Sequence, residues 1–235
     1  MRKQRQEVYE QVGVAATCRG YNEYVRMFAL TGSLEGKRIV DVAAGASSFT
    51  ADCWSRGIDI RAVDPRYSLE PEAVLADARQ EIETSTEKIR ALAHRFDFSY
   101  YGNVDLHREG RLRSYARFAE DFTALGNEGR YVAGSLPALP FTDASFDLVL
   151  CSHFLFLYAD QFGTEFHEQS VLEMIRLCRP GGEVRIYPLI TLRWEPYPHL
   201  EPLLAAIRKA GGTPRLEQSQ LPFIPGSSML LVIDV

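Results

Sequence analysis

Short apolar, β-branched runs alternate along the chain with longer segments in which apolar residues recur every three or four positions. The apolar runs predict buried strands over residues 38–42, 59–63, 131–134, 146–151 and 183–188. The amphipathic segments predict helices over residues 48–56, 164–178 and 198–210. Because strands that alternate with helices form parallel sheets covered on both faces, the pattern predicts a doubly wound α/β fold.

The end of the chain departs from this alternation. Two predicted strands, over residues 215–221 and 229–235, flank the turn-forming stretch Pro222-Phe-Ile-Pro-Gly226. Strands separated by so short a turn form an antiparallel hairpin. We therefore expect a mostly parallel seven-stranded sheet that closes with a C-terminal antiparallel hairpin.

An insertion follows the second predicted strand. A βαβ unit takes about 30 residues, yet the third predicted strand begins about 65 residues after the second. Ser68, Glu70 and Pro71 form a helix start, and a second helical pattern ends near Gly126. We interpret residues 68–128 as a helical cap over the ligand mouth, because the ends of strands are where functional loops gather. The alternative is a structural helix pair that touches no substrate.

The region before the first strand has its own pattern. Residues 5–33 show two helical patterns interrupted near Gly20, the second of them rich in aromatic residues. The interpretation is an N-terminal helical segment over residues 1–35, followed by an α/β domain over residues 36–235. The segment either covers the sheet edge or forms a lid whose tyrosines touch a ligand.

The first predicted strand runs into a stretch of small residues, Ala43-Ala-Gly-Ala-Ser-Ser48. Small side chains let the backbone approach a ligand, and the free amides of the following helix face it. Asp64 ends the second strand nineteen residues after Gly45. An acidic residue at this spacing grips a ribose diol in nucleotide-binding folds. The pattern favours a nucleoside-type ligand, with close packing alone as the alternative.

Composition narrows the class of protein. Of the 235 residues 46% are apolar, which is enough for a large core, and the net charge is −5. An acidic chain attracts neither nucleic acid nor an anionic membrane surface. The four cysteines are scattered without a C-x-x-C pair, so we expect reduced thiols, no metal site and a cytoplasmic protein. The sequence contains no stretch with the length and apolar character of a signal peptide or membrane span.

The predicted cap carries a basic run. It consists of His107, Arg108, Arg111, Arg113 and Arg117. Such a run is usually a solvated helix face. The alternative is that it binds a phosphate or carboxylate group of the substrate.

Four stretches together carry a resemblance to a known family. They are Val40-Asp-Val-Ala-Ala-Gly-Ala-Ser47, Ala62-Val-Asp-Pro65, Leu139-Pro-Phe-Thr-Asp-Ala-Ser-Phe-Asp-Leu-Val149 and Met174-Ile-Arg-Leu-Cys-Arg-Pro-Gly-Gly-Glu-Val184. In this order they resemble the motifs of the class I S-adenosylmethionine-dependent methyltransferases, of the methyltransferase type 11-like kind. The resemblance covers residues 36–235 and implies a Rossmann-like fold with S-adenosylmethionine as cofactor.

The resemblance also implies residues for each part of the cofactor. Residues at the ends of four strands would bind it: Asp41, Ala43, Ala44, Gly45, Asp64, Pro65, Arg66, Ser135, Leu136 and Ser152. The first four would hold the methionine end, the next three would surround the ribose, and Ser135 and Leu136 would line the adenine. Ser152 would lie near the reactive methyl group, beside His153.

Three positions depart from the family's pattern. Alanine replaces the usual glycine at Ala43, and serine replaces it at Ser47. Alanine is acceptable at negative φ but crowds the cofactor. At Ser135 the family often has an aspartate, which accepts the hydrogen bond of the adenine amine more strongly than serine does. These departures leave a relative that binds the cofactor weakly or without transfer as an alternative.

The implied reaction is direct in-line transfer of the methyl group to an oxygen or nitrogen atom of an acceptor. The protein's part is to align the nucleophile and exclude water. His153 is the candidate general base, because a histidine ordinarily titrates near neutral pH. Tyr158 and then His167 are the next candidates.

We expect the acceptor to be a small molecule. Ser152-His-Phe-Leu155 stands where enzymes that methylate base amines carry an Asn-Pro-Pro-Tyr-like motif, and the chain is acidic. The cap aromatics Tyr100, Tyr101 and Tyr115 hint at an apolar or aromatic acceptor. The alternatives are an RNA or protein methyltransferase and a cofactor-binding module without transfer activity. Neither a nucleic-acid nor a membrane partner is expected.

Overall fold

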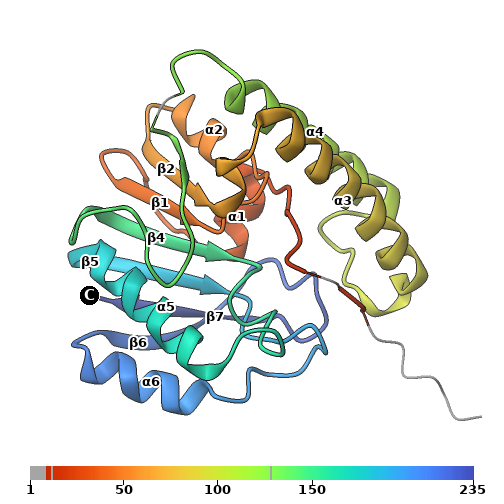
Figure 1. The fold of residues 1–235 in the computed structure, drawn as a ribbon. Helices are drawn as coiled ribbons and strands as arrows, with labels where there is room; N and C mark the ends of the chain where they lie inside the picture. The colour runs from red at the N-terminus through yellow and green to blue at the C-terminus, as the bar shows by residue number, and fades with distance from the viewer. Residues whose placement is uncertain (1–8, 12, 128) are drawn as a thin grey trace, which may run out of the picture.

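The computed structural model describes residues 9–11, 13–127 and 129–235, which form a seven-stranded sheet in the order β3-β2-β1-β4-β5-β7-β6 (Figure 1). The strands are β1 (Arg38–Val42), β2 (Asp59–Asp64), β3 (Tyr131–Ala133), β4 (Phe146–Ser152), β5 (Cys178–Tyr187), β6 (Thr213–Gln218) and β7 (Met229–Asp234). The first five are parallel, whereas β7 runs antiparallel to both β5 and β6. The predicted mostly parallel sheet with a C-terminal hairpin is confirmed.

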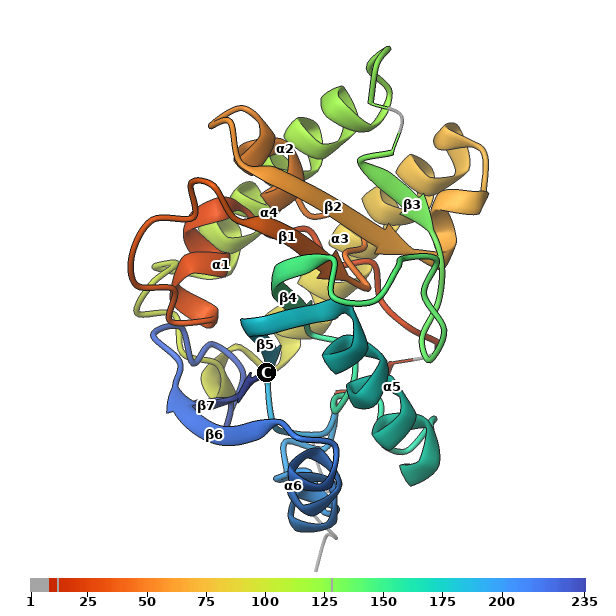
Figure 2. The same ribbon diagram turned by 90° about the vertical axis from the view of Figure 1, so that its left-hand side faces the viewer.

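Helices cover both faces of the sheet because the central strands are apolar on both sides. In β4, Val149 and Cys151 pack into one core cluster with residues of α5 and α6, and Leu148 and Leu150 pack into another with residues of α1 and α2. These helices are α1 (Tyr21–Met27), α2 (Phe49–Trp54), α5 (Thr164–Leu177) and α6 (Leu200–Lys209). Figure 2 shows the two pairs on opposite sides of the strands. The prediction of a doubly wound fold is confirmed.

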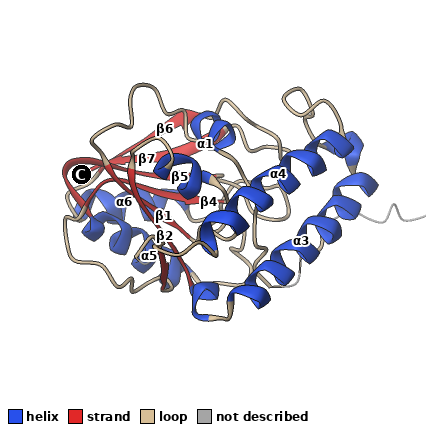
Figure 3. Ribbon diagram, turned by 90° about the horizontal axis from the view of Figure 1, so that it is seen from above, coloured by secondary structure: helices blue, strands red, loops and turns tan. Residues whose placement is uncertain are grey.

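The insertion after β2 is helical, as predicted. It contains η1 (Pro65–Ser68), α3 (Pro71–Ala91), η2 (Ala93–Arg95) and α4 (Val104–Phe122). Proline at the first position of α3 needs no amide partner there, and the Asn103 side chain caps α4 by accepting a hydrogen bond from the Leu106 amide at 2.9 Å. The two long helices lie side by side beyond the sheet, and the arrows of β4 and β5 point toward them (Figures 1 and 3).

The N-terminal region differs from its prediction. Only α1 is helical between residues 13 and 35, and residues 13–20, here called the strap, are irregular. The strap's backbone bonds to the turn between β1 and α2 instead of to itself: the Thr17 carbonyl accepts from the Ala46 amide, and the Arg19 carbonyl accepts from the Ser48 amide, each at 3.0 Å. The predicted helix before Gly20 is therefore wrong where the structure describes it; residues 1–8 and 12 lie outside the described residues.

No helix among the described residues combines the length and apolar character that a membrane span requires. Within the same residues, no three or more His, Cys, Asp or Glu side chains gather in a group that could hold a metal ion.

Candidate active site

The carboxyl ends of β1, β2, β3 and β4 surround a cavity of about 540 Å³, here called the rim cavity. Ala43, residues 64–66, residues 134–136 and residues 152–154 line it. Parallel sheets bind ligands at this edge, and the volume lies within the usual range for small-molecule pockets. The strand ends that the sequence places around one crevice do meet there.

The turn after β1 is left-handed at two positions. Gly45 has a φ of +59°, and a Cβ atom there would lie 3.0 Å from the Thr17 nitrogen, so the strap can approach only because this residue has no side chain. Ala43 has a φ of +54°. The negative φ at which alanine is acceptable is not the one found here, and Ala43 holds a conformation that L-residues adopt at a cost in energy.

Asp64 ends β2 against this turn. One carboxylate oxygen accepts a hydrogen bond from the Gly45 amide at 3.0 Å, and the other accepts from the Arg66 amide at 2.9 Å. Burial raises the pKa of this carboxyl, and the two amides oppose that rise. Each carboxylate oxygen has a second lone pair. Asp64 lines the rim cavity, so it can accept two further hydrogen bonds, as from a diol.

The remaining predicted binding residues divide into two groups. Pro65, Arg66, Ser135, Leu136 and Ser152 line the rim cavity. Asp41, at the end of β1, and the turn residues Ala44 and Gly45 do not line it.

Asp41 is fully buried behind the turn, where Tyr24 Oη donates a hydrogen bond to it at 2.8 Å. Burial raises the pKa of Asp41 to about 8, so the carboxyl is mostly protonated at neutral pH. The Tyr24 ring stacks on Phe49 at 4.2 Å between centroids. Asp41 therefore joins α1 and α2 to the end of β1 instead of facing the cavity.

A second cavity of about 80 Å³, here called the cap cavity, adjoins the first. Both are lined by Ala15, Thr17 and His153, so these three residues form the boundary between them. The cap cavity is also lined by residues of α3 and α4, including Glu81, Ser85, His107 and Arg111. The basic run marks His107 and Arg111 in the sequence, whereas Glu81 and Ser85 belong to no recognisable motif.

His153 follows β4 at this boundary, with a φ of +53°. Its Nδ1 atom lies 2.8 Å from Ser152 Oγ, and burial followed by the cations Arg19 and Arg111 lowers the pKa of the imidazole well below its ordinary value. The expected titration near neutral pH is therefore wrong: the ring is neutral at physiological pH. A neutral imidazole can accept a proton, though as a weaker base than an unperturbed histidine.

The other two catalytic candidates lie differently. Tyr158 Oη accepts a hydrogen bond from the Ala15 amide at 2.8 Å, and burial raises the pKa of Tyr158 to about 12. Tyr158 lines the cap cavity and holds the strap. His167 is buried in α5, where Nδ1 lies 2.9 Å from Tyr197 Oη, and it lines neither cavity.

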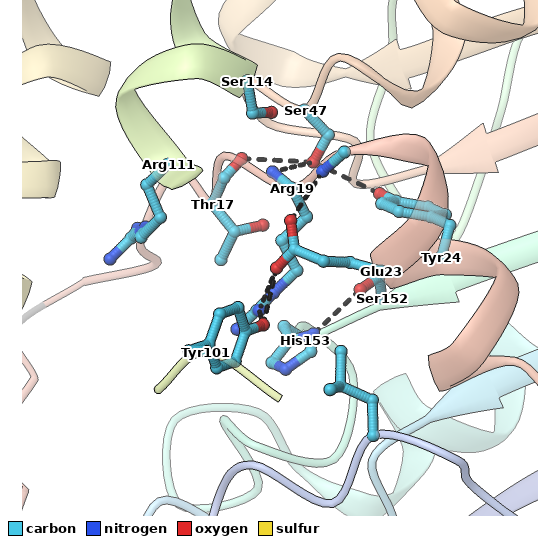
Figure 4. A network of polar contacts seen from close by, with 12 residues as sticks. Thr17, Arg19, Glu23, Tyr24, Ser47, Tyr101, Arg111, Ser114, Ser152 and His153 are labelled. Atoms are coloured by element: carbon cyan, nitrogen blue, oxygen red, sulfur yellow. Dashed lines mark hydrogen bonds and ion pairs between the residues drawn. The ribbon is translucent and has the colours of Figure 1, made fainter. Parts of the chain in front are cut away.

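A polar network that the sequence analysis missed joins the strap to the cap (Figure 4). Arg19 Nη1 donates to Glu23 Oε1 at 3.1 Å, and Tyr101 Oη donates to the same oxygen at 2.6 Å. The Gly20 amide donates to Glu23 Oε2 at 2.8 Å. No periodic pattern marks these residues, because they come together from the strap, α1 and the loop before α4.

Comparison with known proteins agrees with this geometry. Residues 104–186 match the family model described as "Methyltransferase domain". The chain is 32% identical over 216 residues to an uncharacterised protein of Methanocaldococcus jannaschii. The aligned region covers 92% of this chain and 93% of that protein. The family model identifies the chain as a methyltransferase, and the resemblance to the class I S-adenosylmethionine-dependent enzymes is confirmed. S-adenosylmethionine is therefore its cofactor, as the sequence resemblance implied.

Solved structures share the fold. A TehB-like S-adenosylmethionine-dependent methyltransferase from Corynebacterium glutamicum superposes with a TM-score of 0.51 at 16% identity, over 91% of this chain and 87% of that one. Magnesium protoporphyrin IX methyltransferase from Synechocystis, solved with bound S-adenosylmethionine, also superposes with a TM-score of 0.51. Its sequence identity is 14%, over 91% of this chain and 76% of that one.

Replacing Ala43 by glycine should stabilise this methyltransferase. The left-handed conformation costs an alanine about 1–2 kcal/mol, and glycine's greater freedom in the unfolded chain offsets about 0.5–1 kcal/mol of the gain. We expect Ala43→Gly to raise the free energy of unfolding in urea. Ala44→Gly, at a position without positive φ, is the control and should lower it. Equal losses in both variants would contradict the strained conformation of Ala43.

Asp41→Asn should flatten the pH dependence of stability. The pKa is about 8 in the folded state and 3.8 in the unfolded chain, so the folded state holds the extra proton between these values. The carboxyl's contribution to stability is then complete at low pH and is lost as the pH rises through 8. Between about pH 4 and pH 9, the parent should lose at least about 1 kcal/mol more than the variant. The free energy of unfolding is measured with urea at each pH. If it fell with pH equally in the parent and in Asp41→Asn, the raised pKa of Asp41 would be refuted. Asp59→Asn, at an exposed site, is the control and should show the parent's pH dependence.

Proposed function

We propose that this methyltransferase acts on a small-molecule acceptor, methylating an oxygen or nitrogen atom by direct in-line transfer. The observation that carries the proposal is the pair of adjoining cavities that share Ala15, Thr17 and His153. The second cavity is small and lies beneath the cap, which favours a compact acceptor over a nucleic acid or a protein. An RNA or protein methyltransferase, and a binding module without transfer, are the alternatives that experiment must separate.

The residues of the rim cavity fit the cofactor. Asp64 would accept the two ribose hydroxyls through its remaining lone pairs, with Pro65 and Arg66 beside it. Ser135 and Leu136 would line the adenine.

At the other end of the rim cavity, Ala43 and the strap would face the methionine portion, and Ser152 would lie near the methyl group. Asp41, Ala44 and Gly45 would act from behind, by shaping the turn.

When bound, S-adenosylmethionine supplies a methyl group already activated by a sulfonium centre. The chain's own part is to orient the acceptor and to receive its proton. In the tautomer in which His153 Nδ1 donates to Ser152 Oγ, Nε2 carries a free lone pair that can take that proton. A heteroatom that gains a methyl group becomes more acidic, so a weak base suffices. Tyr158 would hold the strap through the Ala15 amide.

A cytoplasmic location belongs to the same proposal. Cys18, Cys53, Cys151 and Cys178 are all free and buried thiols. Free thiols are typical of proteins that work in a reducing compartment.

Asp64→Ala tests cofactor binding and transfer together. The variant lacks the acceptor for the ribose, so its affinity for S-adenosylmethionine in calorimetric titration should fall by about tenfold or more. The parent should transfer labelled methyl from the cofactor into the small-molecule fraction of a cell extract, and the variant should not. Asp59→Ala, at the exposed start of the same strand, is the control and should match the parent.

Three results would contradict this proposal. Label that ribonuclease or protease releases would identify a macromolecular acceptor. Cofactor binding without any labelled product would indicate a binding module. If neither S-adenosylmethionine nor S-adenosylhomocysteine bound at millimolar concentration, the rim cavity would not be the cofactor site.

His153→Asn tests the proton acceptor. Asparagine tolerates a positive φ better than most residues but cannot take up the proton. We expect kcat for the labelled product to fall by about 10²–10⁴-fold, with the dissociation constant of S-adenosylmethionine nearly unchanged. A variant as active as the parent across pH 6–9 would remove His153 from the mechanism.

A further inference from the structure

The basic run on α4 separates into an outer and an inner set. Arg108 pairs with Glu83 at 2.7 Å, Arg113 with Glu109 at 3.8 Å and Arg117 with Glu120 at 3.3 Å, and these pairs lie on the helix surface. His107 and Arg111 instead point inward and are buried, with 1% and 7% of their surfaces exposed. Only the inner two line the cap cavity.

Arg111 is a buried cation that makes no ion pair with any residue the structure describes. Its Nη1 donates to Ser85 Oγ, and no carboxylate among the described residues lies within ion-pair distance of it. The other arginine of the cavity, Arg19, pairs with Glu23 at 3.1 Å. Burying an unpaired charge is unfavourable, so this position favours an anionic ligand. Figure 4 shows Arg111 reaching from α4 beside Thr17 of the strap.

Two further polar groups in the cavity lack partners. Both ring nitrogens of His107 are buried without a hydrogen bond, as is Oε1 of Glu81. Burial, then Arg111 and Arg19, lowers the pKa of His107 to about 2, so the ring is neutral and offers one donor and one acceptor. Unsatisfied buried groups on one wall of a cavity are what a bound polar ligand would satisfy.

Aromatic rings line the cap cavity beside His107. Phe96 lies against Phe223 at 5.0 Å and edge-on to Trp194 at 5.5 Å between centroids, and Phe223 in turn stacks on the His107 ring at 4.7 Å. All four line the cap cavity. Flat walls of this kind accept a planar ring by stacking or edge contact.

We propose that the acceptor is a planar, single-ring carboxylic acid, with its carboxylate on Arg111 and its ring against Phe223 and Phe96. The inference rests on the proposed function, and it names the substrate class of the same site. A planar carboxylate matches the guanidinium fork. Glu81 shares the cavity and repels a phosphate dianion more strongly than a singly charged carboxylate. A cavity of about 80 Å³ excludes an acceptor with two or more rings. The atom to be methylated then lies on the side of Thr17 and His153.

Calorimetric titration of the protein saturated with S-adenosylhomocysteine tests this assignment. The probes are benzoate, benzamide and phenyl phosphate, which share the ring and differ in the group offered to Arg111. We expect benzoate to bind about ten- to hundredfold more tightly than benzamide, the difference that a charge-assisted hydrogen bond supplies. Phenyl phosphate should bind more weakly than benzoate. These comparisons use the parent protein and need no folded variant.

Arg111→Met keeps most of the side-chain volume and removes the charge. It should lower benzoate affinity to the level of benzamide and leave the affinity for S-adenosylhomocysteine unchanged. Arg113→Met, two residues along the same helix and exposed, is the matched control and should bind benzoate as the parent does.

The proposal is overturned if benzoate fails to bind at millimolar concentration, if benzamide binds equally well, or if Arg111→Met keeps the parent's benzoate affinity. If phenyl phosphate bound more tightly than benzoate, the site would prefer a phosphate to a carboxylate, and the proposal would also be overturned. In each case retained binding of S-adenosylhomocysteine leaves the proposed methyltransferase function standing. Loss of that binding in the parent would overturn both.

Discussion

The contact between the strap and the turn after β1 is the constraint on which both cavities depend. The amides of Ala46 and Ser48 donate to the carbonyls of Thr17 and Arg19, and the missing side chain of Gly45 lets the two backbones meet. Because the strap is held there, Ala15 and Thr17 divide the space beneath the cap into two cavities. A strap that lay elsewhere would merge the cavities and leave the acceptor unpositioned.

Two aspartates at the same sheet edge have different environments and hence different roles. Among the described residues, Tyr24 is the one side chain that donates a hydrogen bond to Asp41, so burial keeps the Asp41 carboxyl mostly protonated and its role structural. Asp64 receives two backbone amides and lines the rim cavity, so it can serve as a carboxylate toward a ligand. Surroundings, and not residue type, decide which acid can bind.

The cap combines the same kinds of residue in two arrangements. On its outer face, arginines pair with glutamates, and exposed pairs of this kind add little stability. On its inner face, Arg111 and His107 are buried at a cavity of low dielectric. There an unpaired charge or hydrogen-bonding group costs much free energy, and a ligand that pairs with it binds more strongly. The packing of α4 against α3 therefore decides which of its basic side chains face the cavity.

The sequence by itself determined the sheet, its hairpin, the helical insertion and the strand ends that meet at the rim cavity. Those features follow from hydrophobic period and from short motifs, which are local properties. The sequence did not predict the irregular conformation of the strap. The strap's backbone carbonyls accept hydrogen bonds from the turn at residues 46–48, where a helix would have bonded them within itself. Tertiary structure alone decided the left-handed φ of Ala43, the low pKa of His153 and the inward direction of Arg111. The pKa depends on burial and on charges far away in the chain, and the other two depend on packing between distant segments. No local pattern records either.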